Sequence, residues 1–238
     1  MAKIRLDKYI ASALIISRKD AAALIKKGRI TVNGLVEKSS DAKIEDGSTV
    51  VFDGERLVYS EHLYFMLNKP KGLVCASEDR RENTVISLFP KEYADKGISC
   101  VGRLDKDTVG LLLVTNDGAL SHRLLSPKSE TPKKYLVRTD KPFDVADIET
   151  MRRGIVIEGK NTAPAALEIC AENPFEATIT VTEGKFHEVK RLCYACGEKE
   201  VVFLKRLEFG ALRLDESLAE GEWRALTDEE IKMMKESI

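Results

Sequence analysis

Residues 102–118 read GRLDKDTVGLLLVTNDG, a polar segment that runs directly into a short apolar one. The polar part contains Arg103, Asp105 and Asp107, and the apolar run begins after Gly110 and ends before a turn. A short apolar run bounded by glycines is typical of a buried strand. A loop that enters such a strand is held still, and a rigidly held carboxylate suits catalysis. An Asp in a connecting turn fits equally well, because Asp often bonds nearby backbone amides.

The size and composition of the chain predict a folded protein with a sizeable core. Its 238 residues, 43% hydrophobic and 32% charged, are enough for one large domain or for a small domain and a larger one. The sequence contains no apolar run near the roughly 18 residues that a membrane span requires. Because residues 1–8 also lack an apolar signal region, we expect a cytoplasmic protein without a membrane segment.

Charge is distributed unevenly along the chain, although the net charge is only −1. Residues 1–40 carry nine basic and three acidic side chains, a balance of +6, whereas residues 41–61 carry six acidic and two basic ones. A cationic module joined to a nearly neutral body indicates a polyanionic partner for that module. A basic face that is merely solvated remains the alternative, since charge alone does not exclude it.

The five cysteines predict neither a disulfide framework nor a metal site. Their number is odd and they are spread from Cys75 to Cys196, which disfavours a set of disulfides. Cys193 and Cys196 have the spacing of a metal or redox pair, but the sequence has no second such pair and no His at partner spacing. Together with Val189 and Leu192 they lie on one face of a predicted helix, so we interpret them as core residues.

The N-terminal part of the chain predicts two short helices. The first is expected over residues 5–14, with its apolar residues on one side. Ser17 is expected to cap the second helix, with an acidic residue, Asp20, at the third helical position. That helix ends in two lysines followed by Gly28, where cations complement the helix dipole and glycine terminates the helix.

A small sheet is expected to follow the two helices. A strand over 29–32 leads into the hairpin turn Asn33–Gly34, and a further strand is expected over 48–52. Residues 54–61 are interpreted as a linker. The helices and the sheet together make a compact unit near the lower size limit for independent folding.

Residues 3–55 resemble the S4 RNA-binding domain at many spaced positions. The resemblance is carried by Arg5–Lys8, by Ser17 and Arg18, and by the segment Leu24–Gly34. It implies a small α/β module whose cations face RNA phosphates, a contact that positions RNA more than it specifies sequence. The cations concerned are Arg5, Lys8, Arg18, Lys19, Lys26, Lys27 and Arg29. The S4 module occurs in proteins of several activities, so it does not name one.

The larger part of the chain predicts an irregular succession of strands and helices. Strands are expected over residues 63–67, 111–114, 133–138, 155–157, 166–170, 177–182 and 201–207. Helical segments are expected over residues 86–93, 119–125, 144–153 and 187–196 and after the capping box that begins at Thr227. In the helix over 144–153, Val145, Ile148 and Met151 are expected to face inward. Because strands and helices do not alternate strictly, we predict an α+β body on a mainly antiparallel sheet.

Several cofactor-dependent chemistries lack their sequence signatures. No glycine-rich dinucleotide motif, phosphate-binding P-loop or serine-nucleophile elbow is present. His187 lacks the second His of a zinc protease helix, because position 191 is Arg. With three His in the whole chain, a metal site is not expected. The sequence indicates side-chain chemistry without a cofactor.

Five segments of the body resemble, in order and spacing, the pseudouridine synthases of the RsuA branch, which is named for the small-subunit rRNA enzyme. Residues 102–118 resemble the catalytic motif of that family. The segments Lys69–Gly72, Ser121–Val137, Glu183–Leu192 and Gly221–Thr227 resemble its first loop, tyrosine motif, basic motif and C-terminal signature. The resemblance implies an S4 domain over residues 1–58, and over residues 59–238 a catalytic domain with a mixed, mainly antiparallel sheet and flanking helices.

The resemblance assigns three residues to catalysis. Asp105 corresponds to the carboxylate needed to convert the N-glycosidic bond of a uridine into a carbon–carbon bond, and it must be ionised. Lys190 corresponds to its basic partner, which would hold the carboxylate charged. Tyr135 corresponds to the aromatic residue that packs on the uracil ring. Without the resemblance, Lys190 would be read as a solvated helix residue and Tyr135 as core.

Two further residues are assigned to the substrate. Arg103 would occupy the space vacated by the flipped base or grip a phosphate, and a salt bridge between Arg103 and Asp107 is the alternative. Leu192 would line the pocket, with packing inside the helix core as the alternative. Residues 98–101 lack the lead-in that is common before the catalytic motif, so substrate contacts there are in doubt.

The leading hypothesis is therefore an rRNA pseudouridine synthase that acts as a monomer on 16S rRNA, within the 5′ domain, or on an assembling small subunit. Modification of 23S rRNA by an enzyme of the same branch is the nearest alternative. A noncatalytic rRNA-binding assembly factor is an alternative of another class, which the presence of Asp105, Tyr135 and Lys190 disfavours.

Overall fold

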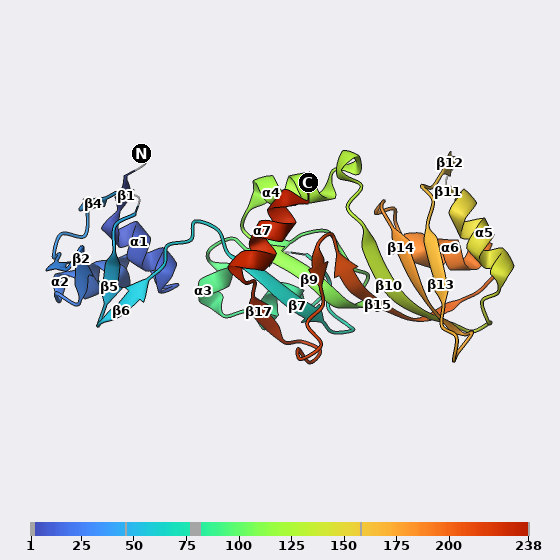
Figure 1. The fold of residues 1–238 in the computed structure, drawn as a ribbon. Coiled ribbons are helices and arrows are strands. Elements are labelled where there is room, and N and C mark those ends of the chain that lie inside the picture. The colour runs from blue at the N-terminus through green and yellow to red at the C-terminus, as the bar shows by residue number, and fades with distance from the viewer. Residues whose placement is uncertain (1–2, 46, 77–81, 158, 238) are drawn as a thin grey trace. The chain divides into compact units, whose positions relative to one another are not determined.

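The computed structural model describes residues 3–45, 47–76, 82–157 and 159–237 (Figure 1). The chain forms two compact units. The first consists of Met1–His62 and Pro90–Lys96, and the second of Leu63–Phe89 and Gly97–Ile238. Among the described residues no helix is both long and apolar enough to cross a membrane.

The first unit contains the two expected helices. Its helices are α1 (Leu6–Ala13), α2 (Arg18–Lys26) and the short α3 (Lys91–Ala94). The hydroxyl of Ser17 accepts the backbone N–H of Asp20 at 3.1 Å, which confirms the predicted cap. Gly28 takes a positive φ of 73° after the last turn of α2, the conformation in which glycine ends a helix.

The sheet of the first unit is larger than the sequence prediction. Its strands are β1 (Ile4–Arg5), β2 (Ile30–Val32), β3 (Leu35–Val36), β4 (Lys43–Ile44), β5 (Val50–Phe52) and β6 (Glu55–Leu57). Four of them form a sheet in the order β3-β2-β5-β6, and β1 pairs with β4. The prediction of a linker over residues 54–61 was wrong, because Glu55–Leu57 pairs with β5. Asp53 and Gly54 have φ of 48° and 91°, close to those of the expected hairpin turn Asn33–Gly34, so the missed turn uses the same left-handed geometry.

The second unit contains the remaining elements. Its helical segments are η1 (Val85–Leu88), α4 (Gly118–Leu125), η2 (Pro127–Ser129), α5 (Val145–Arg153), α6 (Glu188–Ala195) and α7 (Asp228–Glu236). Its first strands are β7 (Tyr64–Lys69), β8 (Ser99–Cys100), β9 (Val109–Thr115), β10 (Lys133–Thr139), β11 (Val156–Ile157) and β12 (Lys160–Asn161). The others are β13 (Ala166–Ile169), β14 (Glu176–Val181), β15 (Val201–Phe209), β16 (Leu212–Arg213) and β17 (Trp223–Ala225).

One long sheet organises the second unit. Its strand order is β13-β14-β10-β15-β9-β7-β17, with β8 on β9 and β16 on β15. All of these pairs are antiparallel except β15 with β9. This arrangement confirms the predicted α+β class and the mainly antiparallel mixed sheet.

Strand β9, which follows the polar segment 102–108, lies inside this sheet and is buried along its whole length. On one face, Leu111 and Leu113 of β9 pack in a core cluster with Leu120 and Leu124 of α4 and with Met234 of α7. Figure 1 shows α4 and α7 over this part of the sheet. Aromatic side chains form a second cluster on this unit, in which the rings of Phe65, Phe89 and Trp223 lie 4.8–5.3 Å apart. The loop before β9 is therefore attached to a rigid strand.

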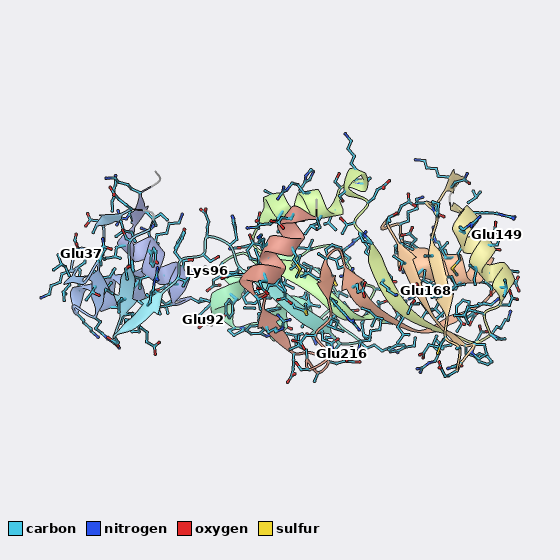
Figure 2. All side chains as sticks on the ribbon, in the orientation of Figure 1. Glu37, Glu92, Lys96, Glu149, Glu168 and Glu216 are labelled. Atoms are coloured by element: carbon cyan, nitrogen blue, oxygen red, sulfur yellow. The ribbon has the colours of Figure 1, made fainter. Side chains whose placement is uncertain are left out.

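Helices α5 and α6 lie beside the β13–β14 end of the sheet (Figure 1). Leu167 of β13 is buried, whereas Glu168 is exposed and accepts hydrogen bonds from Lys134 and Thr178, each at 2.9 Å. Figure 2 labels Glu168 on this strand and Glu149 on α5. The alternation of buried and exposed residues is that of a strand covered on one face only.

The prediction that Val145 faces inward was wrong, since its side chain is 79% exposed. The buried residues of α5 are Asp147 and Met151, one helical turn apart. Asp147 forms an ion pair with Lys199 at 3.0 Å, and both side chains are more than 90% buried. Met151 faces inward as predicted, whereas the other buried position is the charged Asp147, which apolar periodicity does not identify.

Candidate active site

The backbone around Asp105 is fixed on both sides. The N–H of Leu104 donates to the sulfur of Cys75 at 3.3 Å, and the side chain of Leu104 is 7% exposed. After Asp105, the carbonyl oxygen of Lys106 accepts the N–H of Gly72 at 2.7 Å. The N–H of Thr108 donates to the carbonyl oxygen of Asp105 at 3.1 Å. The loop is therefore held to the segment after β7 and closed by its own turn before β9 begins.

Two nitrogen atoms from a distant part of the chain flank the Asp105 carboxylate. Nε2 of His187 lies 3.5 Å from one carboxylate oxygen, and Nζ of Lys190 lies 3.5 Å from the other. The Asp105 side chain is 31% exposed, so it is open to a substrate from one side. A cation and a potential N–H donor therefore face the same carboxylate. The prediction of Lys190 as the basic neighbour of Asp105 agrees with this geometry.

Lys190 contacts Asp107 more closely than Asp105. Its ammonium donates to both carboxylate oxygens of Asp107 at 2.8 Å. This hydrogen bonding lowers the pKa of the Asp107 carboxyl. The alternative of a salt bridge between Arg103 and Asp107 is not realised: Arg103 is exposed and has no ion pair within the described part of the chain.

Helix α6 presents His187 and Lys190 because its opposite side is anchored in the core. Val189, Leu192 and Cys193 are buried, with Leu192 and Cys193 at 0% exposure. His187 precedes the helix with a positive φ of 51°, which is uncommon for a residue with a side chain. The burial of Leu192 matches the alternative of packing inside the helix core. A contact between Leu192 and substrate remains a prediction.

The cysteines of this helix are core residues, as predicted. Cys193 and Cys196 are both buried, and burial raises the pKa of both thiols, that of Cys196 to about 11. Burial therefore disfavours the reactive thiolate form of both side chains. Among the described residues, no group of three or more His, Cys, Asp or Glu side chains could hold a metal ion.

Two buried cations, Lys69 and Arg206, contact the loop and the strand that follows it. The sequence analysis assigned no role to either residue, although Lys69 begins a segment that resembles the family's first loop. Lys69 is fully buried at the end of β7, and its ammonium donates to the carbonyls of Pro70 at 3.0 Å and of Thr108 at 2.9 Å. Burial lowers the pKa of Lys69, while the charges of Asp107 and Asp105, among others, raise it. Lys69 therefore supports the loop from below. Its signal in the sequence was a lysine directly after an apolar strand and before a proline.

The second buried cation is Arg206 in β15, which is 2% exposed. Its Nε donates to the carbonyl of Leu111 in β9 at 2.7 Å. In the parallel pair of β9 and β15, Arg206 lies opposite Gly110, where a Cβ atom would stand 2.3 Å from the Arg206 carbonyl oxygen. The strand that holds the catalytic loop thus approaches its neighbour at a position that only glycine permits.

Tyr135, Arg206 and Gly110 lie opposite one another on the neighbouring strands β10, β15 and β9. Tyr135 is opposite Arg206 in the register of β10 and β15, and its side chain is 8% exposed. Two strand spacings of about 4.8 Å place its backbone about 10 Å from Gly110. The structure thus brings Asp105, Lys190 and His187 together and leaves Tyr135 in the sheet nearby. The stacking of Tyr135 on uracil remains a prediction.

The predicted RNA-binding cations of the first unit fall into two groups. Asp7 accepts hydrogen bonds from Arg5 and Arg18, and Asp53 accepts them from Arg29. Lys8 lies 3.5 Å from a carboxylate oxygen of Glu61. Among the predicted cations, Lys19, Lys26 and Lys27 are exposed and have no ion pair to a described residue. These three lysines are therefore the predicted cations most available to a phosphate.

Comparison with known proteins identifies two families in the chain. Residues 63–195 match the model of RNA pseudouridylate synthases, and residues 4–50 match that of the S4 domain. An uncharacterized RNA pseudouridine synthase from Bacillus subtilis is 43% identical over 98% of this chain and 99% of its own length. The ribosomal small subunit pseudouridine synthase A of Vibrio cholerae is 41% identical over 96% of this chain and 98% of its own length.

The same relationship is found among solved structures. A crystal structure of a pseudouridylate synthase covers 97% of this chain and 99% of its own, with 39% identity and a TM-score of 0.69. The family match includes the loop of Asp105, the strand of Tyr135 and the helix of Lys190. The chain therefore belongs to the RNA pseudouridine synthases, which are isomerases, and among them to the RsuA type with an N-terminal S4 domain.

Proposed function

We propose that this protein isomerises one uridine to pseudouridine within the 5′ domain of 16S rRNA. Relatives named ribosomal small subunit pseudouridine synthase A, about 40% identical over nearly the full length, support a small-subunit target. In this proposal residues 1–58 bind rRNA through the S4 module and residues 59–238 carry out the isomerisation. We also infer a cytoplasmic location, where rRNA is available as substrate.

The observation that carries the proposal is the position of the Asp105 carboxylate between His187 and Lys190. In the reaction the bond from C1′ of the ribose to N1 of uracil breaks and a bond from C1′ to C5 forms. The proton on C5 is lost and N1 gains one, so the atoms balance without a co-reactant. Among the described carboxylates, Asp105 is the one that both nitrogens face. In the proposal it acts on the sugar or the base while Lys190 holds it in position.

In the same proposal Tyr135 supplies an apolar aromatic surface for the flipped uracil. Removing a base from its stack costs a few kcal/mol, part of which an aromatic contact returns. Arg103, which is exposed beside the loop, binds a phosphate or occupies the space that the base has left. The lysines of α2 attract the RNA backbone without reading its sequence.

The test is to map pseudouridine in 16S and 23S rRNA from cells that lack this protein. We expect loss of one pseudouridine in the 5′ domain of 16S rRNA, restored by the wild-type chain and by the surface variant Asp95→Asn, but not by Asp105→Asn. Loss of a 23S rRNA modification instead would assign the sister specificity. If Asp105→Asn restored the modification, Asp105 would not be the catalytic residue.

Binding must be measured in parallel, because loss of product has two causes. We expect Asp105→Asn to bind a 16S rRNA transcript with nearly wild-type affinity, since the residue carries no phosphate contact in the proposal. A variant that lost binding and product together would indicate a structural or binding role for Asp105. If the deletion strain grew poorly and Asp105→Asn fully restored its growth, the result would favour a noncatalytic assembly factor.

A further inference from the structure

A second concave surface lies beside the catalytic group, between α6 and the strand β11. It is a groove of about 610 Å³, a volume typical of sites that hold small organic ligands. Ile155 and Val156 form one wall and Tyr194 and Ala195 the other, while His187, Lys190 and Arg191 also line it. The groove is thus apolar along both walls and cationic along one edge. All of it belongs to the second compact unit.

The apolar side chains of this groove are unusually exposed for their type. Val156 is 68% exposed and Tyr194 is 57% exposed. Phe186, next to the lining residue His187, is 64% exposed and its ring stacks on the His187 ring with centroids 3.8 Å apart. Exposed apolar residues that gather in one place mark a binding surface, whereas scattered ones do not.

The walls of the groove are held in place by hydrogen bonds. The backbone N–H of Ile155 donates to the hydroxyl of Thr162 at 3.0 Å, and β11 pairs with β12. Lys185 donates to the carbonyl of Asn161 at 2.9 Å, which ties the loop before α6 to this hairpin. On the other wall α6 is anchored by its buried face. The groove is therefore formed before a ligand arrives, which reduces the cost of binding.

The charge of the groove suits a nucleic acid. Its described lining contains Arg191, His187 and Lys190, whose ammonium is paired with Asp107, and no acidic residue. The Arg191 guanidinium lies 5.6 Å from the centre of the Phe186 ring, so a cation and an aromatic face are offered together. Aromatic faces on which bases stack, with cations for the phosphates, are the usual composition of a site for single-stranded RNA.

The groove is also continuous with the catalytic group. His187 and Lys190, the residues that flank Asp105, contribute to its lining. A molecule in the groove would therefore lie directly next to the uridine that reacts at Asp105. Because the substrate is RNA, the chemical group next to the reacting uridine is another nucleotide. A protein segment could also pack against the apolar side chains of the groove, but it would not require the basic side chains beside them.

We propose that the groove between α6 and β11 binds the unstacked base of a nucleotide adjacent to the target uridine, with Tyr194 as its stacking surface. The proposal rests on the function proposed above and extends it with a second nucleotide site. It makes Tyr194, Phe186 and Val156 determinants of substrate recognition that act without touching the reacting atoms. Binding at this site would hold the flipped uridine close to Asp105.

The first test is the kinetics of Tyr194→Ala on a 16S rRNA transcript. We expect KM to rise roughly tenfold, the usual effect of losing one base–aromatic stack, with kcat at saturating RNA kept within about threefold. Phe175→Ala is the matched control, since Phe175 is an exposed aromatic residue of the same unit, 41% exposed and outside the groove. An unchanged KM for Tyr194→Ala would overturn the proposal.

The second test replaces nucleotides next to the mapped uridine by abasic ones. At one flanking position the abasic RNA should raise KM for the wild type by about as much as Tyr194→Ala does with the intact RNA. Combining the two changes should then add little, because both remove the same contact. Fully additive effects at every flanking position would contradict a base in the groove.

The third test separates this proposal from the proposed function. The wild-type protein is irradiated with rRNA that contains 4-thiouridine, and the crosslinked peptides are identified by mass spectrometry. Crosslinks to residues 191–195 or to Val156, which do not face Asp105, support the groove even if no pseudouridine were formed, and crosslinks confined to other segments overturn it. A defect of Tyr194→Ala seen with assembling ribosomal particles but absent with naked RNA would overturn the RNA site and assign the groove to a ribosomal protein.

Discussion

At the scale of single residues, the group around Asp105 places one cation next to two carboxylates. Lys190 lies between two carboxylates, 3.5 Å from Asp105 and 2.8 Å from Asp107. The closer contact is bidentate and holds the ammonium in one place. Charge-assisted hydrogen bonds of this kind are stronger than neutral ones. Asp107 thus acts as a positioning residue for Lys190, and through Lys190 for Asp105.

Replacing Asp107 by Asn should therefore slow the reaction without abolishing it. We expect kcat to fall roughly three- to thirtyfold, because a small displacement of a positioned group is costly in catalysis. Asp107→Glu, which keeps the charge, should recover part of the loss. Single-turnover kinetics on a 16S rRNA transcript measure both variants. If Asp107→Asn were as inactive as Asp105→Asn, Asp107 would be needed for the chemistry itself.

A second prediction at this scale concerns Lys133 in β10. Its ammonium donates to the carbonyls of Thr131 at 2.7 Å and Thr182 at 3.2 Å, and its burial lowers its pKa to about 8. In the unfolded chain its pKa is near 10.4, so between these values the unfolded state binds more protons. The contribution of Lys133 to stability should therefore rise from pH 8 to about pH 10, by an amount on the order of 2 kcal/mol.

Urea denaturation of the wild type and of Lys133→Met over pH 7–10 measures this contribution. The free energy of unfolding of the wild type should rise relative to that of the variant as the pH increases through this range. Lys134→Met is the control, because Lys134 forms a surface ion pair with Glu168 and should leave the pH dependence unchanged. Parallel pH profiles of the wild type and Lys133→Met would contradict the prediction.

At the scale of elements, the decisive contact is the parallel pair of β9 and β15. It is the one parallel pair of the main sheet among the described residues, and it joins the strand after Asp105 to a strand near the end of the chain. Gly110 has a φ of 100° at this contact, which residues with side chains rarely adopt. The nearest backbone atoms of Arg206 leave no room for a Cβ. The catalytic loop is therefore set by the fit of two strands.

Gly110→Ala should consequently destabilise the second unit, by roughly 3 kcal/mol or more, because both the backbone conformation and the space oppose it. Gly118→Ala is the matched control, since no atom lies within 4 Å of its added Cβ and it begins helix α4. There alanine should be neutral or slightly stabilising. Thermal and urea denaturation compare the two variants. Equal stability of Gly110→Ala and the wild type would contradict the close fit of β9 and β15.

At the scale of the whole molecule, the basic residues near the N-terminus differ in whether a carboxylate neutralises them. Residues 1–40 carry a balance of +6, but Arg5, Arg18 and Arg29 are paired with carboxylates of their own unit. Lys19, Lys26 and Lys27 on and after α2 are exposed, and no described carboxylate pairs with them. Only part of the formal charge is therefore available to RNA.

Replacing Lys19, Lys26 and Lys27 together by Gln should weaken RNA binding and reduce its dependence on salt. Each phosphate contact that is lost lowers the slope of log K against log salt by about 0.7–0.9, so the triple variant should lose roughly 2. The rate at saturating RNA should stay near that of the wild type. Filter binding of a 16S rRNA transcript between 50 and 300 mM salt measures the slope. The control is a variant in which Lys91, Lys128 and Lys232 are replaced by Gln. An equal loss of salt dependence in this variant would indicate general electrostatic attraction instead of contacts at α2.

The sequence alone predicted the features that depend on neighbouring residues. Ser17 capping α2, the capping box at Thr227 and the turn Asn33–Gly34 are each encoded within four residues, and all are present. The family resemblance predicted the S4 module, the fold of the larger unit and the enzyme class for the same reason, since its motifs are local. A local rule failed at Val145 because the helix buries the charged Asp147, which pairs with the distant Lys199, and leaves Val145 exposed.

Only the tertiary structure decided which residues meet. Asp107 and Lys190 are 83 positions apart in the chain, and Nε of Arg206 reaches a carbonyl 95 positions away. Such contacts depend on the order of strands in the sheet, which no short segment encodes. The same holds for the burial of Lys69 and for the groove beside α6. The sequence by itself thus determined the family and predicted Asp105 as the carboxylate, whereas the packing of β9 on β15 and of α6 beside the loop determined what surrounds Asp105.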